Sequence, residues 1–211
     1  MAQKVLASIS DKSSPVSPSG YAGGTQVLPS QAIQHAWFEL TRTRPWRSVA
    51  LIAADERTAT LSLAMELSQM ASLDPRNRVL LLNATGHSDL LGNRPNGGFA
   101  APGGSNAVPA AQGKYWILDC AKMGMDEATA GMVEVPKHTD QLRQGQSAYT
   151  MLLIATNALL SSPAAVSAAR SADTTVICVT LGHTSFTDAK RCVELVGEEN
   201  VAGTIAIRPR R

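Results

Sequence analysis

Aromatic residues are scarce in this chain: only 4% of its 211 residues are Phe, Trp or Tyr. Hydrophobic residues nevertheless make up 44% of the sequence, so its core must be built from Ala, Val, Leu, Ile and Met. A chain of this length can bury enough of these side chains to form one domain with a substantial core.

Long hydrophobic runs are also missing. No stretch reaches the ~18 consecutive apolar residues that a membrane-spanning helix needs. The first residues lack the apolar core of a signal peptide, because Val5–Ala7 are followed at once by Ser8, Ser10 and Asp11. We therefore expect a cytoplasmic protein without direct membrane insertion, which reaches the inner membrane only through a partner.

Neither charge nor cysteine is present in a pattern that marks a nucleic-acid or metal site. The formal net charge is +2, whereas nucleic-acid binders usually carry a clustered basic excess. The three cysteines are odd in number, and neither they nor the four histidines have metal-ligand spacing. We predict no nucleic-acid partner, no metal, and structural thiols in a reducing compartment.

The segment Ser48–Met70 organises the rest of the chain. Its pattern predicts a buried strand over Ser48–Ala53 and an amphipathic helix over Thr58–Met70. A turn between such a strand and helix is where α/β proteins place phosphates, because the free N–H groups of the helix start point into it. The turn Asp55–Thr60 has neither glycine nor lysine. It predicts the position of a phosphate loop without the chemistry of one.

Strands and helices are expected to alternate along the remaining chain. This order predicts an α/β fold with a mostly parallel sheet flanked by helices on both faces. Residues 1–29 are predicted to be a flexible arm and 30–211 a single domain with a disordered loop over 92–113. The predicted strands are 79–82, 115–119, 149–155, 174–180 and 201–207, and the predicted helices are 30–42, 139–144, 163–172 and 185–196, the last with Phe186 facing inward.

Five segments occur in the order found in a known family. They are Phe38–Thr43, Val79–Leu82, Tyr115–Leu118, Ser147–Thr156 and Val201–Ile207. From about residue 36 to 208 the chain resembles the cytoplasmic bacterial tyrosine kinases (BY-kinases) of capsule and exopolysaccharide synthesis. That family lies within the ParA/MinD-type ATPases with a deviant Walker motif, so the resemblance implies a P-loop NTPase-like fold. The resemblance rests on pattern and order.

The resemblance places the family's phosphate-binding Gly-x-Gly-Lys-Ser/Thr on Arg57, Thr58, Ala59, Thr60 and Leu61. Glycines allow positive φ and close approach to phosphate, which Arg57 and Ala59 do not. The lysine position is Thr60, and a unit charge at ~4 Å is worth about 4 kcal/mol at an effective dielectric of 20. Its loss implies nucleotide affinity weaker by on the order of a hundredfold or more. Leu61 cannot ligate magnesium.

The other nucleotide positions are changed as well. The resemblance places the second acidic motif on Asn83 and Thr85, the Walker B aspartate on Ala155 and the adenine-side asparagine on Arg208. Magnesium would have none of its carboxylates and water no base. No tyrosine cluster follows, and the family's assembly motif retains Arg42 but has Ala36 in place of the acid. The resemblance thus implies no catalytic residues and makes ATP and Mg²⁺ binding doubtful.

These losses favour a pseudokinase-like partner or regulator in bacterial polysaccharide biosynthesis and export. It would dock onto a membrane-bound polysaccharide co-polymerase or synthase component, and self-association into a homo-oligomer stays open. Two alternatives also stay open. One is a ParA/MinD-like positioning or scaffolding protein. The other is an ATPase or tyrosine kinase with a non-standard loop, for which Lys114, Lys122 and Asp119 are the candidate replacements.

Three further groups of residues invite a chemical interpretation. Asp119 is interpreted as a strand-end cap or solvated residue. His87 or His183, with Ser185 and Asp188, could form a hydrolase triad, but no Gly-x-Ser-x-Gly elbow is present and Ser185 more simply caps a helix. Arg57 and the adjacent helix start could bind a small anion, although Asp55 and Glu56 oppose this; a surface turn is favoured.

Overall fold

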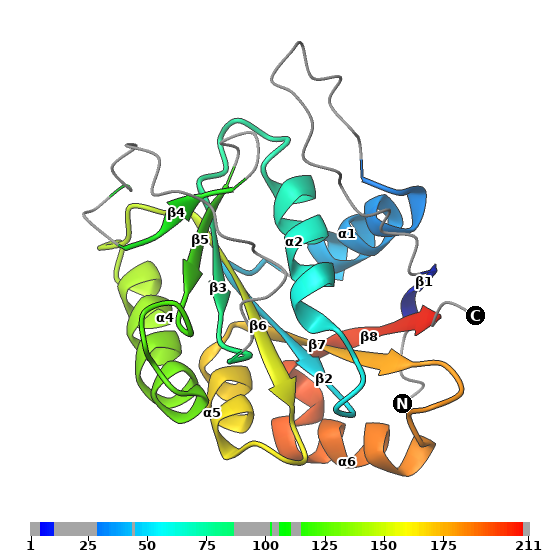
Figure 1. Ribbon diagram of the computed structural model, residues 1–211. Coiled ribbons are helices and arrows are strands. Elements are labelled where there is room, and N and C mark those ends of the chain that lie inside the picture. Colours follow the sequence, from blue (N-terminus) through cyan, green and yellow to red (C-terminus); the bar gives the residue numbers. More distant parts are fainter. Residues whose placement is uncertain are drawn as a thin grey trace, which may run out of the picture.

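Eight strands form one sheet in the computed structural model, which describes residues 5–10, 29–43, 45–86, 102, 106–110 and 115–208 (Figure 1). Every neighbouring pair is parallel except the last, which is antiparallel. The predicted fold class is therefore confirmed. The strands lie in the order β1 (Val5–Ser10), β8 (Val201–Arg208), β7 (Thr174–Thr180), β2 (Ser48–Ala53), β6 (Met151–Ala158), β3 (Val79–Asn83), β5 (Trp116–Asp119) and β4 (Val108–Pro109).

Helices cover both faces of the sheet (Figure 1). Helices α1 (Gln31–Thr43) and α2 (Thr60–Ala71) pack on one face. The opposite face carries the helices α4 (Val135–Arg143), α5 (Pro163–Ser171) and α6 (Phe186–Val196). Shorter helical segments are α3 (Glu127–Thr129), the π-helix η4 (Ala130–Glu134) and the 3₁₀-helix η5 (Glu198–Asn200).

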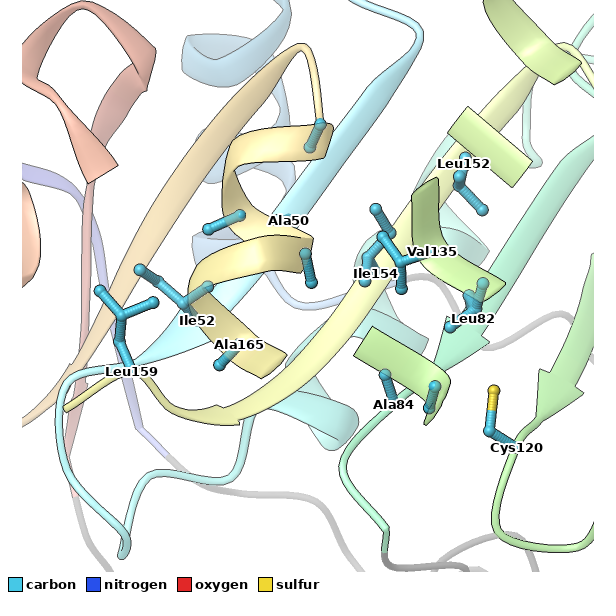
Figure 2. Close-up of a cluster of buried hydrophobic side chains, with 14 of the residues drawn as sticks. Ala50, Ile52, Leu82, Ala84, Cys120, Val135, Leu152, Ile154, Leu159 and Ala165 are labelled. Atoms are coloured by element: carbon cyan, nitrogen blue, oxygen red, sulfur yellow. The ribbon is translucent and has the colours of Figure 1, made fainter. Parts of the chain in front are cut away.

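Successive residues of the central strands point to opposite faces. In β2, Val49 and Leu51 pack against α1 and α2, whereas Ala50 and Ile52 pack toward α5. Figure 2 shows the second cluster, in which Ile52 and other strand residues lie beside side chains of the covering helices. Because the central strands are buried on both faces, they read in the sequence as continuous apolar runs. This double burial explains why their positions were predictable.

Strand β1 was not predicted. It lies within the arm expected over residues 1–29, and its residues pair in parallel with β8, as in Ser8↔Ala206. Residues 11–28 and most of 92–113 lie outside the described part of the chain, so the division into arm, domain and disordered loop stays a prediction. Within 92–113, Val108–Pro109 form β4, which pairs with β5.

The sequence predicted only the end of the helical segment that follows β5. Helical structure begins at Glu127 rather than Thr139, with Asp126 capping it by accepting a 2.7 Å hydrogen bond from the backbone N–H of Thr129. It continues through the π-helix, where Gly131 packs directly against the backbone of Ala164. Glycine and a nearby proline argue against a helix locally, and this tertiary contact overrides that preference.

Two predicted details of the second half were wrong. Strand β6 begins at Met151 rather than Tyr149 and continues to Ala158. Phe186 does not face inward, because its side chain is 82% exposed while Cys192 and Val196 form the buried face of α6. None of the helices in the described segments is long and apolar enough to cross a membrane.

Candidate functional site

The candidate site lies at the carboxyl edge of the sheet, between the ends of β2 and β6 and the start of α2. Thr60, the position of the family's lysine, is the first residue of α2 and only 2% exposed. Its hydroxyl donates a 2.6 Å hydrogen bond to the carbonyl oxygen of Thr156 in β6. The side chain at this position therefore points into the protein and joins two elements.

The loop between β2 and α2 is bonded to the turn that follows β7. The hydroxyl of Thr184 donates to the carboxylate of Asp55, and the hydroxyls of Thr58 and Thr180 share a 2.8 Å hydrogen bond. At the surface, the guanidinium of Arg57 donates to Nδ1 of His183 at 3.2 Å. Three separate contacts thus hold the loop against its neighbour.

Asp55 also organises the loop from within. Its Oδ1 accepts hydrogen bonds from the backbone N–H of Arg57 at 2.9 Å and from the hydroxyl of Thr58 at 3.2 Å. Helix α2 starts at an N-cap, Ala59, whose side chain forms no capping hydrogen bond. The loop places a carboxylate, rather than a lysine, beside this helix start. The carboxylate of Asp55 is thereby engaged in contacts within the protein.

Strand pairing brings several of the predicted positions together. Ala155 in β6 lies opposite both Leu51 in β2 and Asn83 in β3. Leu61 is 4% exposed and belongs to the hydrophobic cluster beneath α2. Apolar and amide side chains therefore stand where the resemblance would place magnesium ligands. Within the described residues, no group of three or more His, Cys, Asp or Glu side chains has the arrangement of a metal site.

Asp119 ends β5 beside Asn83 and is buried, with 5% exposure. Its Oδ1 accepts a 3.1 Å hydrogen bond from Nδ2 of Asn83, whose Oδ1 in turn accepts from the backbone N–H and hydroxyl of Thr85. The solvated interpretation of Asp119 is thus wrong. Its Oδ2 has no hydrogen-bond partner among the residues that the structure describes.

Other predicted positions are not part of this cluster. Arg208 ends β8, which is separated from β2 by β7. Ala36 is 1% exposed in the core, so its side chain is not available to a partner, whereas Arg42 pairs with Glu39 at 3.2 Å. His87 and Lys114 lie outside the described residues.

The hydrolase residues that the structure describes, His183, Ser185 and Asp188, do not form a triad. Ser185 caps α6, as the simpler interpretation predicted, by accepting a 3.0 Å hydrogen bond from the backbone N–H of Asp188. Its hydroxyl donates to the Asp188 carboxylate at 2.7 Å, while His183 faces Arg57. No nucleophile–base pair involving Ser185 and His183 is present in the described residues.

The cysteines are free and buried, consistent with structural thiols. Burial raises the pKa of Cys120 to about 12, with the carboxylates of Glu134 and Asp119 adding to the effect. Burial likewise raises the pKa of Cys178 to about 12. For Cys192, burial and the carboxylates of Asp188 and Asp55 raise the pKa to about 11. Such thiols are poor nucleophiles.

Sequence reasoning missed the partners of the loop. Thr156, Thr180 and Thr184 were not identified as part of the site, although each supplies a polar contact to it. Their only signal is a hydroxyl at or just after the carboxyl end of a predicted strand. That edge is where polar groups from different strands meet in a parallel sheet.

The fold is P-loop NTPase-like, of the type shared by bacterial tyrosine-kinase domains and MinD. The chimerical protein CapA2B2 is similar with a TM-score of 0.71 and 12% identity over 97% of this chain and 94% of its own. The kinase domain of Escherichia coli tyrosine kinase ETK is similar with a TM-score of 0.68 and 14% identity, over 97% of this chain and 89% of its own. The Aquifex aeolicus cell division protein MinD is similar with a TM-score of 0.54 and 18% identity, over 78% of this chain and 70% of its own.

These similarities confirm the predicted resemblance at the level of the fold. No protein-family profile matches the chain. No curated protein matches it significantly either.

Proposed function

We propose that this protein is a non-catalytic, pseudokinase-like partner or regulator in bacterial exopolysaccharide or capsule-type polysaccharide biosynthesis and export. One observation carries the proposal: Thr60, at the lysine position, is buried and uses its hydroxyl to bond Thr156. A side chain committed to the fold cannot neutralise a phosphate. The loop before it is likewise bonded to the β7–α6 turn.

The proposed partner is a membrane-bound polysaccharide co-polymerase or synthase component. The fold likeness to bacterial tyrosine-kinase domains and the order of the resembling segments support this class of partner. The protein would act in the cytoplasm and reach the inner membrane through this contact. Neither ATP nor magnesium is required in this proposal.

Calorimetric titration with ATP and with ADP, each with magnesium, tests the non-catalytic part. We expect no heat and no thermal stabilisation at millimolar nucleotide, because Thr60 stands at the lysine position and the loop before it carries the carboxylate of Asp55. The E. coli ETK kinase domain, handled identically, is the positive control. Micromolar binding would contradict the proposal and favour an ATPase or kinase with a non-standard loop.

Co-expression tests the partner. The tagged chain is co-expressed with the membrane co-polymerase and synthase components of its own genome and recovered from detergent extract. We expect one of these components to be retained at salt concentrations that release unrelated membrane proteins. Failure of every such component to associate would remove the polysaccharide assignment, even if nucleotide binding were absent.

The likeness to MinD and to McdA favours one alternative, a positioning or scaffolding protein. In that case the chain would dimerise without nucleotide. Sedimentation equilibrium at micromolar concentration tests this alternative, since a monomeric mass would contradict the scaffold.

A further inference from the structure

We draw no further inference here: the strongest candidate, the outer edge of strand β1 at the end of the sheet, belongs to a strand that pairs with β8 on its inner side, and nothing in the described part of the chain shows what covers its other side.

Discussion

The hydroxyl of Thr60 donates a 2.6 Å hydrogen bond to the carbonyl oxygen of Thr156, which lies 96 residues further along the chain. The bond joins the first residue of α2 to β6, at the edge where a nucleotide phosphate would have to bind. Thr60 stands where the resemblance places a phosphate-binding lysine, and here its side chain bonds within the protein instead. The consequences for stability can be measured directly.

Replacing Thr60 with Val keeps the side-chain shape and removes this buried hydrogen bond. We expect the free energy of unfolding to fall by about 1–3 kcal/mol, because a buried acceptor loses its donor. Urea denaturation measures the change. Thr41→Val is the matched control, since Thr41 is exposed and bonds only within its own helix, so its effect should be within about 0.5 kcal/mol. Equal losses of unfolding free energy in the two variants would show that the buried bond of Thr60 adds no stability beyond that of an exposed one.

Gly131 is expected to tolerate no side chain. An added Cβ would lie 2.6 Å from the carbonyl oxygen of Ala164, a backbone atom that cannot move without shifting α5. Gly131→Ala should therefore destabilise the protein by about 1–3 kcal/mol. Met132→Ala, on the same π-helix with a 48% exposed side chain, is the control and should change little. Thermal unfolding of both variants compares them; a stable Gly131→Ala would mean that the two helices are not in close contact.

Asp173 should make stability depend on pH. Burial alone would raise its pKa, but hydrogen bonds from the backbone N–H groups of Arg47 and Ser48 and from the guanidinium of Arg143 outweigh it. Its pKa in the folded protein is below the ordinary value of 3.8, so its contribution is present above that pH and is lost as the pH falls through the folded pKa. At neutral pH, Asp173→Asn should cost on the order of 1 kcal/mol, a modest amount because water partly screens the group. Urea denaturation at several pH values should show the difference shrinking under acid. A difference that stays constant down to about pH 2 would contradict the assignment.

Ser185→Ala should destabilise α6 by about 1 kcal/mol, since the hydroxyl caps the helix by accepting from the N–H of Asp188. Thr187→Ala, an exposed substitution in the same turn, serves as the control. Circular dichroism during urea denaturation reports both. Loss of an esterase activity in Ser185→Ala without loss of stability would instead revive the hydrolase interpretation.

The cysteine thiols should be unreactive in the folded protein. Burial raises the pKa of Cys120 and of Cys178 to about 12, and of Cys192 to about 11, so all three stay protonated at pH 8. Dithionitrobenzoate should label none of them in buffer and all three in urea. Rapid labelling of one thiol in buffer would show local opening of the element that carries it.

The central strands could be predicted from the sequence because β2, β3 and β7 are buried on both faces. A strand buried on both faces is largely apolar, and that leaves a short, nearly continuous apolar run between turns. Edge strands carry no such signal. Strand β1 lies at the edge of the sheet, where it pairs with β8. Strand β4, at the other edge, has only two residues, which is too short for a recognisable pattern.

The degenerate chemistry of the candidate site was also visible in the sequence. The absence of glycine and lysine from Asp55–Thr60 follows from residue types alone. What replaces that chemistry did not follow. The bonds from Thr60 to Thr156 and from Thr58 to Thr180 join residues 96 and 122 positions apart. A hydroxyl can bond to many groups, so its partner is decided by which strand ends meet.

The sequence by itself determined the fold class and the absence of glycine and lysine from the turn Asp55–Thr60, because both depend on which side chains occur and at what spacing. The tertiary structure alone decided which polar groups face one another. The burial of Asp119 beside Asn83 and the meeting of Arg47, Arg143 and Asp173 arise only when distant strands align. Hydrophobic burial follows local pattern, whereas hydrogen bonds and ion pairs require two groups to be brought within about 3 Å of each other.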